Sequence, residues 1–535
     1  MLKRTRFLVL FFLISIFLDI TAAFLTTLQK NDPNPLYTTN FPFTPLYEPN
    51  KDFLNGRTCF FDPKYMAISI TPFFQRASKG TNMNNDQAEL GDLTGRWNMI
   101  AVLPYNEPTA STTNFDATNL NIDLPTNTCS PTDVTKLTEI RDSLLTCIRS
   151  VFYNATTDSY LPYPEQLKTV QGLLSLQTSN ELFGFFSVPI KYRKYGVRFE
   201  FSGVLYKGLG FTADIGVSNI SQSAKFVDMT TSTTCNKQEL CLTACPSNLT
   251  PLIACLNPFS TTTVSTTQWG NVIKCVNTKL MDKLNDIAKA TQLDLCNYNK
   301  TSIEDFHGEI FYRQAFCINN KRSREWPRFL LIPFFQLGGT VAMAKEGSDN
   351  VAFSLPSGNN GFNCMTFLGG LSLDFANTIE VGGEGGFNHY FKRKITCMRV
   401  PTTEFQNGII PYQTEVCIDP GNVWHFSLYM NSRYFVEHTS AWFQYVYINH
   451  DKDNFTVLGP NVSLATENEP PNEQVAVFLP GELKCKSAWT AQLFNFGLNY
   501  DISPNFSLGA LAQIPMSRTN AYRSSTLFVS LNMFF

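Results

Sequence analysis

The chain carries little charge for its size, and it has no long apolar run beyond its first segment. Charged residues make up 16% of its 535 residues, whereas an ordinary soluble domain carries about 25%. Aromatic residues still reach 13%, which excludes a disordered chain, because such chains are poor in aromatics and rich in charge. After residue 23 no stretch has about 18 uninterrupted apolar residues, so a helical membrane protein is also excluded.

Several kinds of binding chemistry are missing as well. The net charge of −2 gives no electrostatic footprint for a nucleic-acid partner. None of the five histidines lies in an HExxH motif or at paired-ligand spacing, and the DxD pair of Asp451 and Asp453 lacks the other ligands of a Ca²⁺ loop, so no metal is predicted. The nucleotide-binding patterns GxxxxGK[ST] and strand–GxGxxG–helix are absent, so no cofactor is predicted.

The first segment predicts export. Residues 1–23 combine a basic start, an apolar stretch at 7–18 and small residues at 21–23, which is the pattern of a cleaved signal peptide. The apolar stretch is too short to cross about 30 Å of hydrocarbon. Residues 24–57 are rich in proline and lack periodicity, so we expect an extended periplasmic lead-in. The 14 cysteines then predict disulfides in an oxidising compartment, with their connectivity left open.

The main structural signal is a period of two, which places apolar residues on one face of a strand and polar residues on the other. The alternating positions cover seven to nine residues in each segment, so with their flanking residues the strands run about nine to twelve residues. This is the length that a tilted strand needs to cross a bilayer, whereas the strands of a soluble sandwich average five or six. Tight turns are predicted at 206–209, 375–378, 431–434 and 501–505, with long polar loops between other segments. The segments are 66–74, 96–103, 183–190, 197–205, 209–217, 309–316, 335–343, 367–375, 379–387, 424–430, 441–448, 494–500, 506–514 and 527–535.

The end of the chain carries a resemblance. Apolar residues occupy alternate positions up to a terminal phenylalanine: Leu527, Val529, Leu531, Met533 and Phe535. This pattern resembles the closing strand of bacterial outer-membrane β-barrel proteins, including porins, and implies that the barrel-assembly machinery reads it as an assembly signal. The cysteine content is loosely similar to that of the major outer-membrane proteins of chlamydia-like bacteria. Lipid offers no hydrogen bonds to the backbone groups at an open strand edge, so strands that span a membrane must close into a barrel.

We therefore predict an all-β fold, a transmembrane antiparallel barrel over residues 58–535 in the bacterial outer membrane. Even strand numbers are the rule in such barrels, which favours 14 strands and leaves 12 and 16 open. Residues 130–177 and 220–308 interrupt the alternation with helical periodicity and many cysteines, so we expect helical insertions there. An inward plug and a disulfide-pinned surface subdomain are both open readings of these insertions, and the second is favoured because amphipathic helices mostly cover a core.

If the apolar residues at every second position of a strand face lipid, then the residues between them face the lumen of the barrel. Charged rings at close range set ion selectivity, so an excess of carboxylates predicts a weak preference for cations. The lumen then offers passive diffusion to small polar solutes, with outer-membrane lipid around the barrel. The residues predicted to line this pore are Arg198, Glu200, Asp214, Glu380, Glu384 and His425.

Other functions are compatible with parts of the sequence. A non-conducting adhesin or structural protein, joined to its neighbours by disulfides or as a homo-oligomer, fits the cysteines. His450 followed by Asp451 and Asp453 would suit a hydrolase at the barrel rim, although such a run is usually a solvated loop, so we expect no enzyme. Seven Asn-x-Ser/Thr sequences, the acceptor pattern for N-glycosylation, are compatible with a eukaryotic secreted glycoprotein. In such a protein the strand that ends in phenylalanine would have no role. The seven sequences occur at Asn154, Asn219, Asn248, Asn299, Asn454, Asn461 and Asn505.

Overall fold

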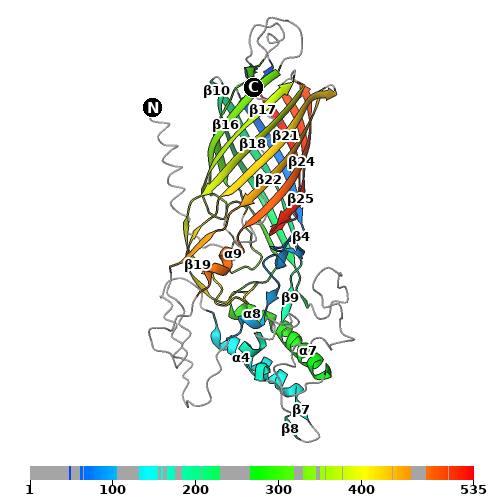
Figure 1. Ribbon diagram of the computed structural model, residues 1–535, viewed down its shortest axis with the longest axis vertical. Helices are drawn as coiled ribbons and strands as arrows, with labels where there is room; N and C mark the ends of the chain where they lie inside the picture. The colour runs from blue at the N-terminus through cyan, green and yellow to red at the C-terminus, as the bar shows by residue number, and fades with distance from the viewer. Residues whose placement is uncertain are drawn as a thin grey trace.

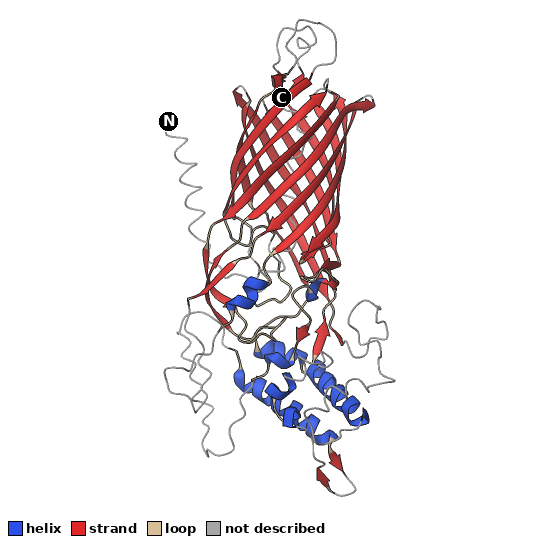
Figure 2. Cartoon of the chain, in the orientation of Figure 1, coloured by secondary structure: helices blue, strands red, loops and turns tan. Residues whose placement is uncertain are grey.

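Twelve antiparallel strands close into a barrel, and a mixed cap of helices and short strands covers one of its ends (Figures 1 and 2). The first strand pairs with both the second and the last, which closes the ring. The computed structural model describes residues 47–49, 61–63, 66–104, 132–154, 158–160, 165–174, 184–206, 208–228, 266–318, 329–344, 347, 350–355, 357–375, 378–436, 438–458, 478–503 and 505–535. The predicted signal peptide and most of the predicted lead-in lie outside these residues.

The barrel strands are longer than strands of soluble sheets, as tilted membrane strands are. In chain order they are β3 (Met66–Ala77), β10 (Ile190–Tyr206), β11 (Leu209–Ala224), β14 (Phe306–Arg313), β16 (Phe329–Val341), β17 (Cys364–Phe375), β18 (Ile379–Tyr390), β21 (Val423–Val436), β22 (Thr439–His450), β24 (Trp489–Ser503), β25 (Phe506–Thr519) and β27 (Ser525–Phe534). Two further strands extend the wall: β13 (Tyr298–Ile303) pairs with β11, and β15 (Phe316–Cys317) pairs with β16.

The prediction of 14 strands is not confirmed, and the alternative of 12 is the number observed among the described residues. Two predicted strands, 96–103 and 183–190, lie in the cap. They form only the short strands β6 (Trp97–Asn98) and β9 (Phe185–Ser187), which pair with each other. Both segments are apolar because they are buried in the cap core, so their apolar residues do not mark a lipid-facing side.

One predicted turn is also wrong. The turn expected at 431–434 falls inside β21, which continues to Val436 before β22 begins at Thr439. The tight connections after β10, β17 and β24 lie where the sequence predicts them. These hairpins share one end of the barrel, here called the turn end, and the cap lies at the other (Figure 1).

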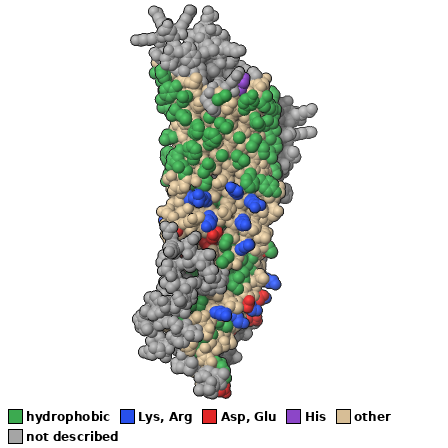
Figure 3. Space-filling view, turned by 90° about the vertical axis from the view of Figure 1, so that its right-hand side faces the viewer, with side chains coloured by type: hydrophobic (Ala, Val, Ile, Leu, Met, Phe, Trp, Pro, Cys, Tyr) green, Lys and Arg blue, Asp and Glu red, His purple; other side chains and the backbone are tan. Residues whose placement is uncertain are grey.

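Alternation along each strand separates an apolar outside from a polar inside. In β27 Leu527 and Val529 are exposed, while Phe528 and Ser530 at the alternate positions are buried. The chain's terminal Phe535 is 64% exposed. Figure 3 shows the result as a continuous apolar band around the visible face of the barrel. A closed barrel with such a band is the form in which strands cross a membrane, because every backbone group is paired within the ring.

The described helices are too short or too polar to span a membrane. The closed barrel of twelve strands with its apolar outer band has the form of a bacterial outer-membrane protein, whose single-chain barrels have even strand numbers. The expected localisation in the outer membrane is confirmed.

The cap contains the helices and the remaining short strands. The helices are α4 (Val134–Val151), α7 (Thr266–Asp282), α8 (Leu284–Ala290) and α9 (Pro480–Cys485), with single 3₁₀ turns η2 (Leu90–Asp92), η3 (Ile100–Val102) and η5 (Glu165–Leu167). The strands, besides β6 and β9, are β4 (Lys79–Thr81), β5 (Gln87–Glu89), β7 (Tyr153–Asn154), β8 (Ser159–Tyr160), β12 (Val227–Asp228), β19 (Arg393–Arg399), β20 (Gln413–Asp419), β23 (Asn454–Val457) and β26 (Ala521–Tyr522). A separate pair joins β1 (Tyr47–Pro49) to β2 (Phe61–Pro63).

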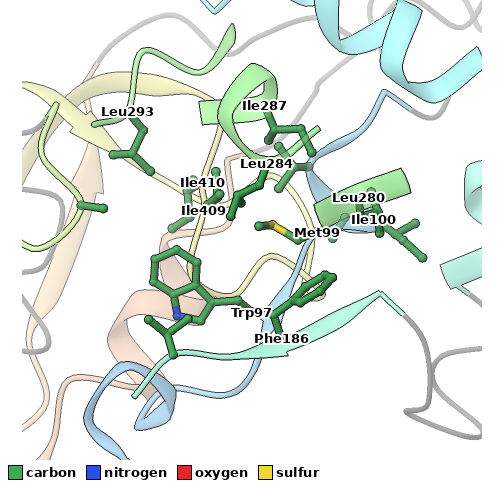
Figure 4. Close-up of a cluster of buried hydrophobic side chains, with 14 of the residues drawn as sticks. Trp97, Met99, Ile100, Phe186, Leu280, Leu284, Ile287, Leu293, Ile409 and Ile410 are labelled. Carbon is green, nitrogen blue, oxygen red and sulfur yellow. The ribbon is translucent and has the colours of Figure 1, made fainter. Parts of the chain in front are cut away.

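A single apolar core holds the cap together (Figure 4). Trp97 lies at its centre, stacked on Phe353 with ring centroids 5.9 Å apart, and its indole nitrogen donates to the Gly91 carbonyl at 2.8 Å. Leu284 and Ile287 of α8 bring the helical layer onto the same core. The cap is therefore a folded unit with its own core, and the helices belong to it.

Both predicted helical insertions contribute to this unit. The side chain of Asp133 caps the start of α4 by accepting from the Lys136 amide at 3.0 Å. A disulfide between Cys147 and Cys275 joins α4 to α7 across 128 residues of chain. Cys397 is also disulfide-bonded, whereas the cysteines between 235 and 255 lie outside the described residues, so a cysteine-rich insertion stays a prediction. The described helices thus lie in the cap, at one end of the barrel.

One buried carboxyl group lies between the cap and the barrel rim. Asp92 accepts hydrogen bonds from the Ser187 hydroxyl and, at 2.8 Å, from the Val188 amide. Burial raises the pKa of Asp92 from 3.8 to about 6, against the opposite effect of these two hydrogen bonds. Its charged form is therefore less favourable in the folded cap than in water.

Candidate functional site in the barrel lumen

The inward face of the barrel carries the polar side chains that the alternation predicts. The six residues predicted to line a pore all lie on this face: Arg198 and Glu200 on β10, Asp214 on β11, Glu380 and Glu384 on β18, and His425 on β21. Glu200 and Asp214 are direct cross-strand partners, so they share one face. Whether these residues line a conducting path stays a prediction.

An ion-pair cluster occupies the lumen near the turn end. Glu380, one residue inside the β17–β18 hairpin, accepts from Arg313 Nη2 at 2.6 Å and from Arg433 Nη2 at 2.5 Å. Asp374 adds a contact to Arg433 Nη1 at 3.1 Å, and the Ser372 hydroxyl donates to Glu380 at 2.7 Å. Because Arg313 is three strands away from Glu380 in the wall, this contact crosses part of the lumen.

A second cluster lies closer to the cap. Glu304 is 1% exposed and accepts from Lys194 Nζ at 2.7 Å and from Arg198 Nε at 2.8 Å. The guanidinium of Arg198 also lies 4.5 Å from the centre of the Phe73 ring, at cation–π distance. The charge of Arg198 is thus balanced by a neighbouring carboxylate and a ring face.

The middle of the lumen is acidic. Asp214 pairs with His307 Nδ1 at 3.1 Å. Glu200, Glu309 and Glu384 face the same space and have no ion-pair partner among the described residues. These three carboxyl groups, here called the acidic midsection, are the uncompensated acids of the lumen.

Neutral hydrogen-bonding groups continue from the acidic midsection across neighbouring strands. The Ser427 hydroxyl donates to Glu384 at 2.7 Å and Gln444 Nε2 donates to it at 3.0 Å. Gln444 in turn accepts from Asn495 Nδ2 at 3.0 Å. Four adjacent strands, β18, β21, β22 and β24, thereby present a continuous polar surface to the lumen.

Several rings lie flat against this wall because glycine faces them on the next strand. A Cβ atom at Gly370 would lie 2.3 Å from Phe334 Cζ, and one at Gly382 would lie 2.5 Å from Tyr429 Cζ. Glycine in a strand interior often marks such a close approach. These glycines let large side chains lie along the wall, which leaves more of the lumen cross-section to polar groups.

One row of the inner wall is apolar. Phe73, Phe528, Leu511 and Trp442 form a buried cluster along a single register row, with Gly497 between the last two. The Phe73 and Phe528 rings are 6.1 Å apart between centroids. This row, here called the apolar row, runs across five of the twelve strands of the ring.

Two inward side chains have unused hydrogen-bonding groups. Both side-chain atoms of Asn388, which is fully buried, and both ring nitrogens of His425, which is 1% exposed, have no partner among the described residues. The two are diagonal neighbours on β18 and β21, since Gly386 pairs with His425 and Asn388 with Val423. Buried polar groups without partners cost free energy, which binding of water or a polar solute recovers.

His450, considered as a catalytic base at the barrel rim, is held differently. It is 3% exposed, its Nε2 lies 3.1 Å from Asp453 Oδ1, and its ring stacks on Trp489 with centroids 5.7 Å apart. Asp453 is fully buried and also accepts from the Gly421 amide at 2.8 Å. The pair is packed into the wall, away from solvent.

The described residues contain no group of His, Cys, Asp and Glu that could hold a metal ion.

Sequence reasoning missed the bases that neutralise the lumen. Lys194 lies on the same face of β10 as Arg198, and a predicted strand that began earlier would have included Lys194. Arg433 falls in the segment read as a turn, and Arg313 in a strand with weak alternation. Glu304 lies between β13 and β14, so no strand pattern pointed to it.

Comparisons with known proteins give likenesses to solved barrels. No protein-family model and no curated protein sequence matches the chain. An outer-membrane channel from Pseudomonas putida F1 is 6% identical, with a TM-score of 0.38 over 88% of this chain and 96% of that chain. The NanC porin is 9% identical, with a TM-score of 0.25 over 64% and 93% of the two chains. The translocator domain of the autotransporter NalP from Neisseria meningitidis is 7% identical, with a TM-score of 0.26 over 65% and 82%. Similarity at this level carries no argument about what the chain does.

Proposed function

We propose that the barrel is a narrow diffusion channel for small polar solutes and ions, with a weak preference for cations. The observation that supports it is the inner wall itself, which combines the acidic midsection with the unpartnered groups of Asn388 and His425. A wall of this kind offers hydrogen bonds to a passing solute and holds cations at carboxylates.

The preference for cations follows from which charges are compensated. Glu304, Glu380 and Asp374 are neutralised by neighbouring Lys and Arg side chains. The acidic midsection is not, so it sets the sign of the potential in the lumen. Short hairpins at one end and a large folded cap at the other match the periplasmic and extracellular ends of outer-membrane barrels. Solutes would therefore pass the cap first and reach the ion-pair cluster at the turn end last.

The test is the current through single molecules of the refolded protein in a planar bilayer, under a KCl gradient. We expect discrete steps and a reversal potential on the cation side. Replacing the acidic midsection by glutamine (Glu200→Gln, Glu309→Gln, Glu384→Gln) is expected to move the reversal potential toward zero. A matched triple variant on exposed cap residues (Glu139→Gln, Asp282→Asn, Glu404→Gln) is expected to leave it unchanged. An equal shift in both triples would show that the lumen carboxylates do not set selectivity.

A second candidate is a non-conducting surface protein, favoured by the apolar row and by the well-packed cap. If the apolar row seals the lumen, the folded protein gives no current, with folding checked by heat-modifiable gel mobility. Phe73→Ala then discriminates further, because removing this ring is expected to raise conductance only where the row is the narrowest part of an open path. The buried state of His450 gives no support to hydrolysis, and we propose no enzymatic activity.

A further inference from the structure

The outer surface of the barrel changes abruptly from apolar to basic at the cap end. Figure 3 shows Lys and Arg side chains gathered directly below the apolar band. On β3, β10 and the segment before β27, four exposed bases point outward: Arg76, Lys191, Arg193 and Arg523. These four residues are here called the basic belt.

Register places the members of the basic belt close together. Arg76 and Arg193 are direct cross-strand partners, and Ser525 is the partner of Arg76 on its other side. Lys191 lies two residues from Arg193 on the same outward face, and Arg523 precedes Ser525 by two residues. Like charges directly opposite each other destabilise a sheet.

The surrounding residues do not relieve this repulsion. Among the described residues, no acid forms an ion pair with any member of the basic belt. Glu89 is close to this sector, but it contacts Lys79 at 3.9 Å. The belt is therefore a concentrated positive surface that lacks an anion.

The depth of the belt in the membrane follows from its neighbours. The next outward residues toward the turn end are Phe74 beside Arg76, Tyr195 beside Arg193 and Leu527 beside Ser525, which are 42%, 52% and 51% exposed. One such step is about 7 Å along a strand. The basic groups thus lie at the edge of the apolar band, where aromatic rings favour the interface and a bilayer presents its headgroups.

We propose that the basic belt binds the phosphate groups of anionic lipid headgroups in the leaflet on the cap side. Guanidinium groups bind phosphate through paired hydrogen bonds, and two of them stand side by side here. The acyl chains of the same lipid would cover the apolar band on the turn-end side of the belt. The belt thus meets both ends of one lipid molecule, which is why we assign it to a lipid rather than to a free anion.

Affinity for individual lipids tests the proposal. Native mass spectrometry of the refolded protein in detergent would compare binding of dimyristoyl phosphatidic acid with that of dimyristoyl phosphatidylcholine. Arg76, Lys191 and Arg193, three of the four residues of the basic belt, are expected to account for about 10- to 100-fold tighter binding of the anionic lipid. The triple variant Arg76→Gln, Lys191→Gln, Arg193→Gln is expected to lose this difference.

The control removes three exposed lysines elsewhere, as Lys274→Gln, Lys289→Gln, Lys452→Gln, and is expected to keep the difference. Equal binding of the two lipids, or equal loss in both triple variants, would overturn the proposal. A third measurement adds inorganic phosphate as a competitor of the bound phosphatidic acid. If it displaces phosphatidic acid at concentrations comparable with those of the lipid, the belt is a site for free anions and the assignment to lipid is wrong. Gel mobility confirms that each variant has folded as a barrel.

Discussion

The ion-pair cluster at Glu380 makes the sharpest prediction about the barrel interior. Glu380 is 3% exposed and joins two arginines from opposite sides, and Asp374 also contacts Arg433. The variant Glu380→Gln keeps the shape of the side chain and removes its charge. Arg313 and Arg433 then both lose their contact with the Glu380 carboxylate, and Arg433 keeps its contact with Asp374.

The magnitude follows from burial. Removing one partner of a buried ion pair costs about 3–5 kcal/mol, because the remaining charge stays buried without compensation. Arg433 is 20% exposed and Arg313 is 35% exposed, so solvent screens part of this cost, and we expect the lower end, about 3 kcal/mol. The control is the cap pair Lys394–Glu415, whose side chains are 59% and 32% exposed. Glu415→Gln is expected to cost at most about 1 kcal/mol.

The assay is urea unfolding of the refolded protein in detergent, followed by the mobility of the folded barrel on gels. Adding Arg433→Gln to Glu380→Gln is expected to cost less than the sum of the two single changes, since the two residues share one interaction. A Glu380→Gln variant as stable as Glu415→Gln would show that the cluster is solvated, and would refute the argument from burial. Additive effects in the double variant would refute the coupling.

Three further predictions concern packing, protonation and cross-linking. Gly370→Ala is expected to destabilise the barrel by about 1–3 kcal/mol because the added Cβ meets a ring, whereas Gly369→Ala on the outer face, with its nearest contact at 3.9 Å, serves as control in the same urea titration. Asp92 has a raised pKa, so the folded cap binds its proton more tightly than the unfolded chain. Its contribution is therefore present below pH 3.8 and lost as pH rises to about 6, by about 3 kcal/mol; Asp92→Asn should remove this slope from melts of the helical circular dichroism signal. Replacing Cys147 and Cys275 by serine is expected to cost the cap about 2–4 kcal/mol in the same melts, and barrel mobility on gels should not change.

Alternation predicted the barrel well, because one rule governs every strand that has lipid on one side. Leu527 and Val529 face outward and Ser530 inward for the same reason as their counterparts on the other strands. The rule failed where both sides of a segment are protein. The segment at Trp97 and the segment at Phe186 are apolar because the cap core surrounds them, and they raised the expected number of strands from twelve to fourteen.

The charges of the lumen were predicted less completely than the strands. Arg198 and Glu380 have the inward parity that the sequence indicates, but the partners that neutralise them come from distant parts of the chain. Glu304 reaches Arg198 across 106 positions, and Arg313 reaches Glu380 across 67. Alternation along a strand shows on which side of the wall a residue lies. Which residues meet across the lumen depends on the number of strands and on their shear, and the sequence does not encode these locally.

Barrel and cap are stabilised by opposite arrangements of the same residue types. The barrel has ion pairs and amides inside and apolar residues outside, in lipid, while the cap has Trp97, Leu284 and Ile287 inside and exposes charged residues such as Glu139 and Lys274 to water. Reduction of the disulfide and titration of Asp92 should therefore change the melting of the cap alone. Loss of charge at Glu380 should change the unfolding of the barrel alone. If a single cooperative transition responded to all three, then the cap and barrel would unfold as one unit, and a lumen opened by cap movement would require partial unfolding of the barrel itself.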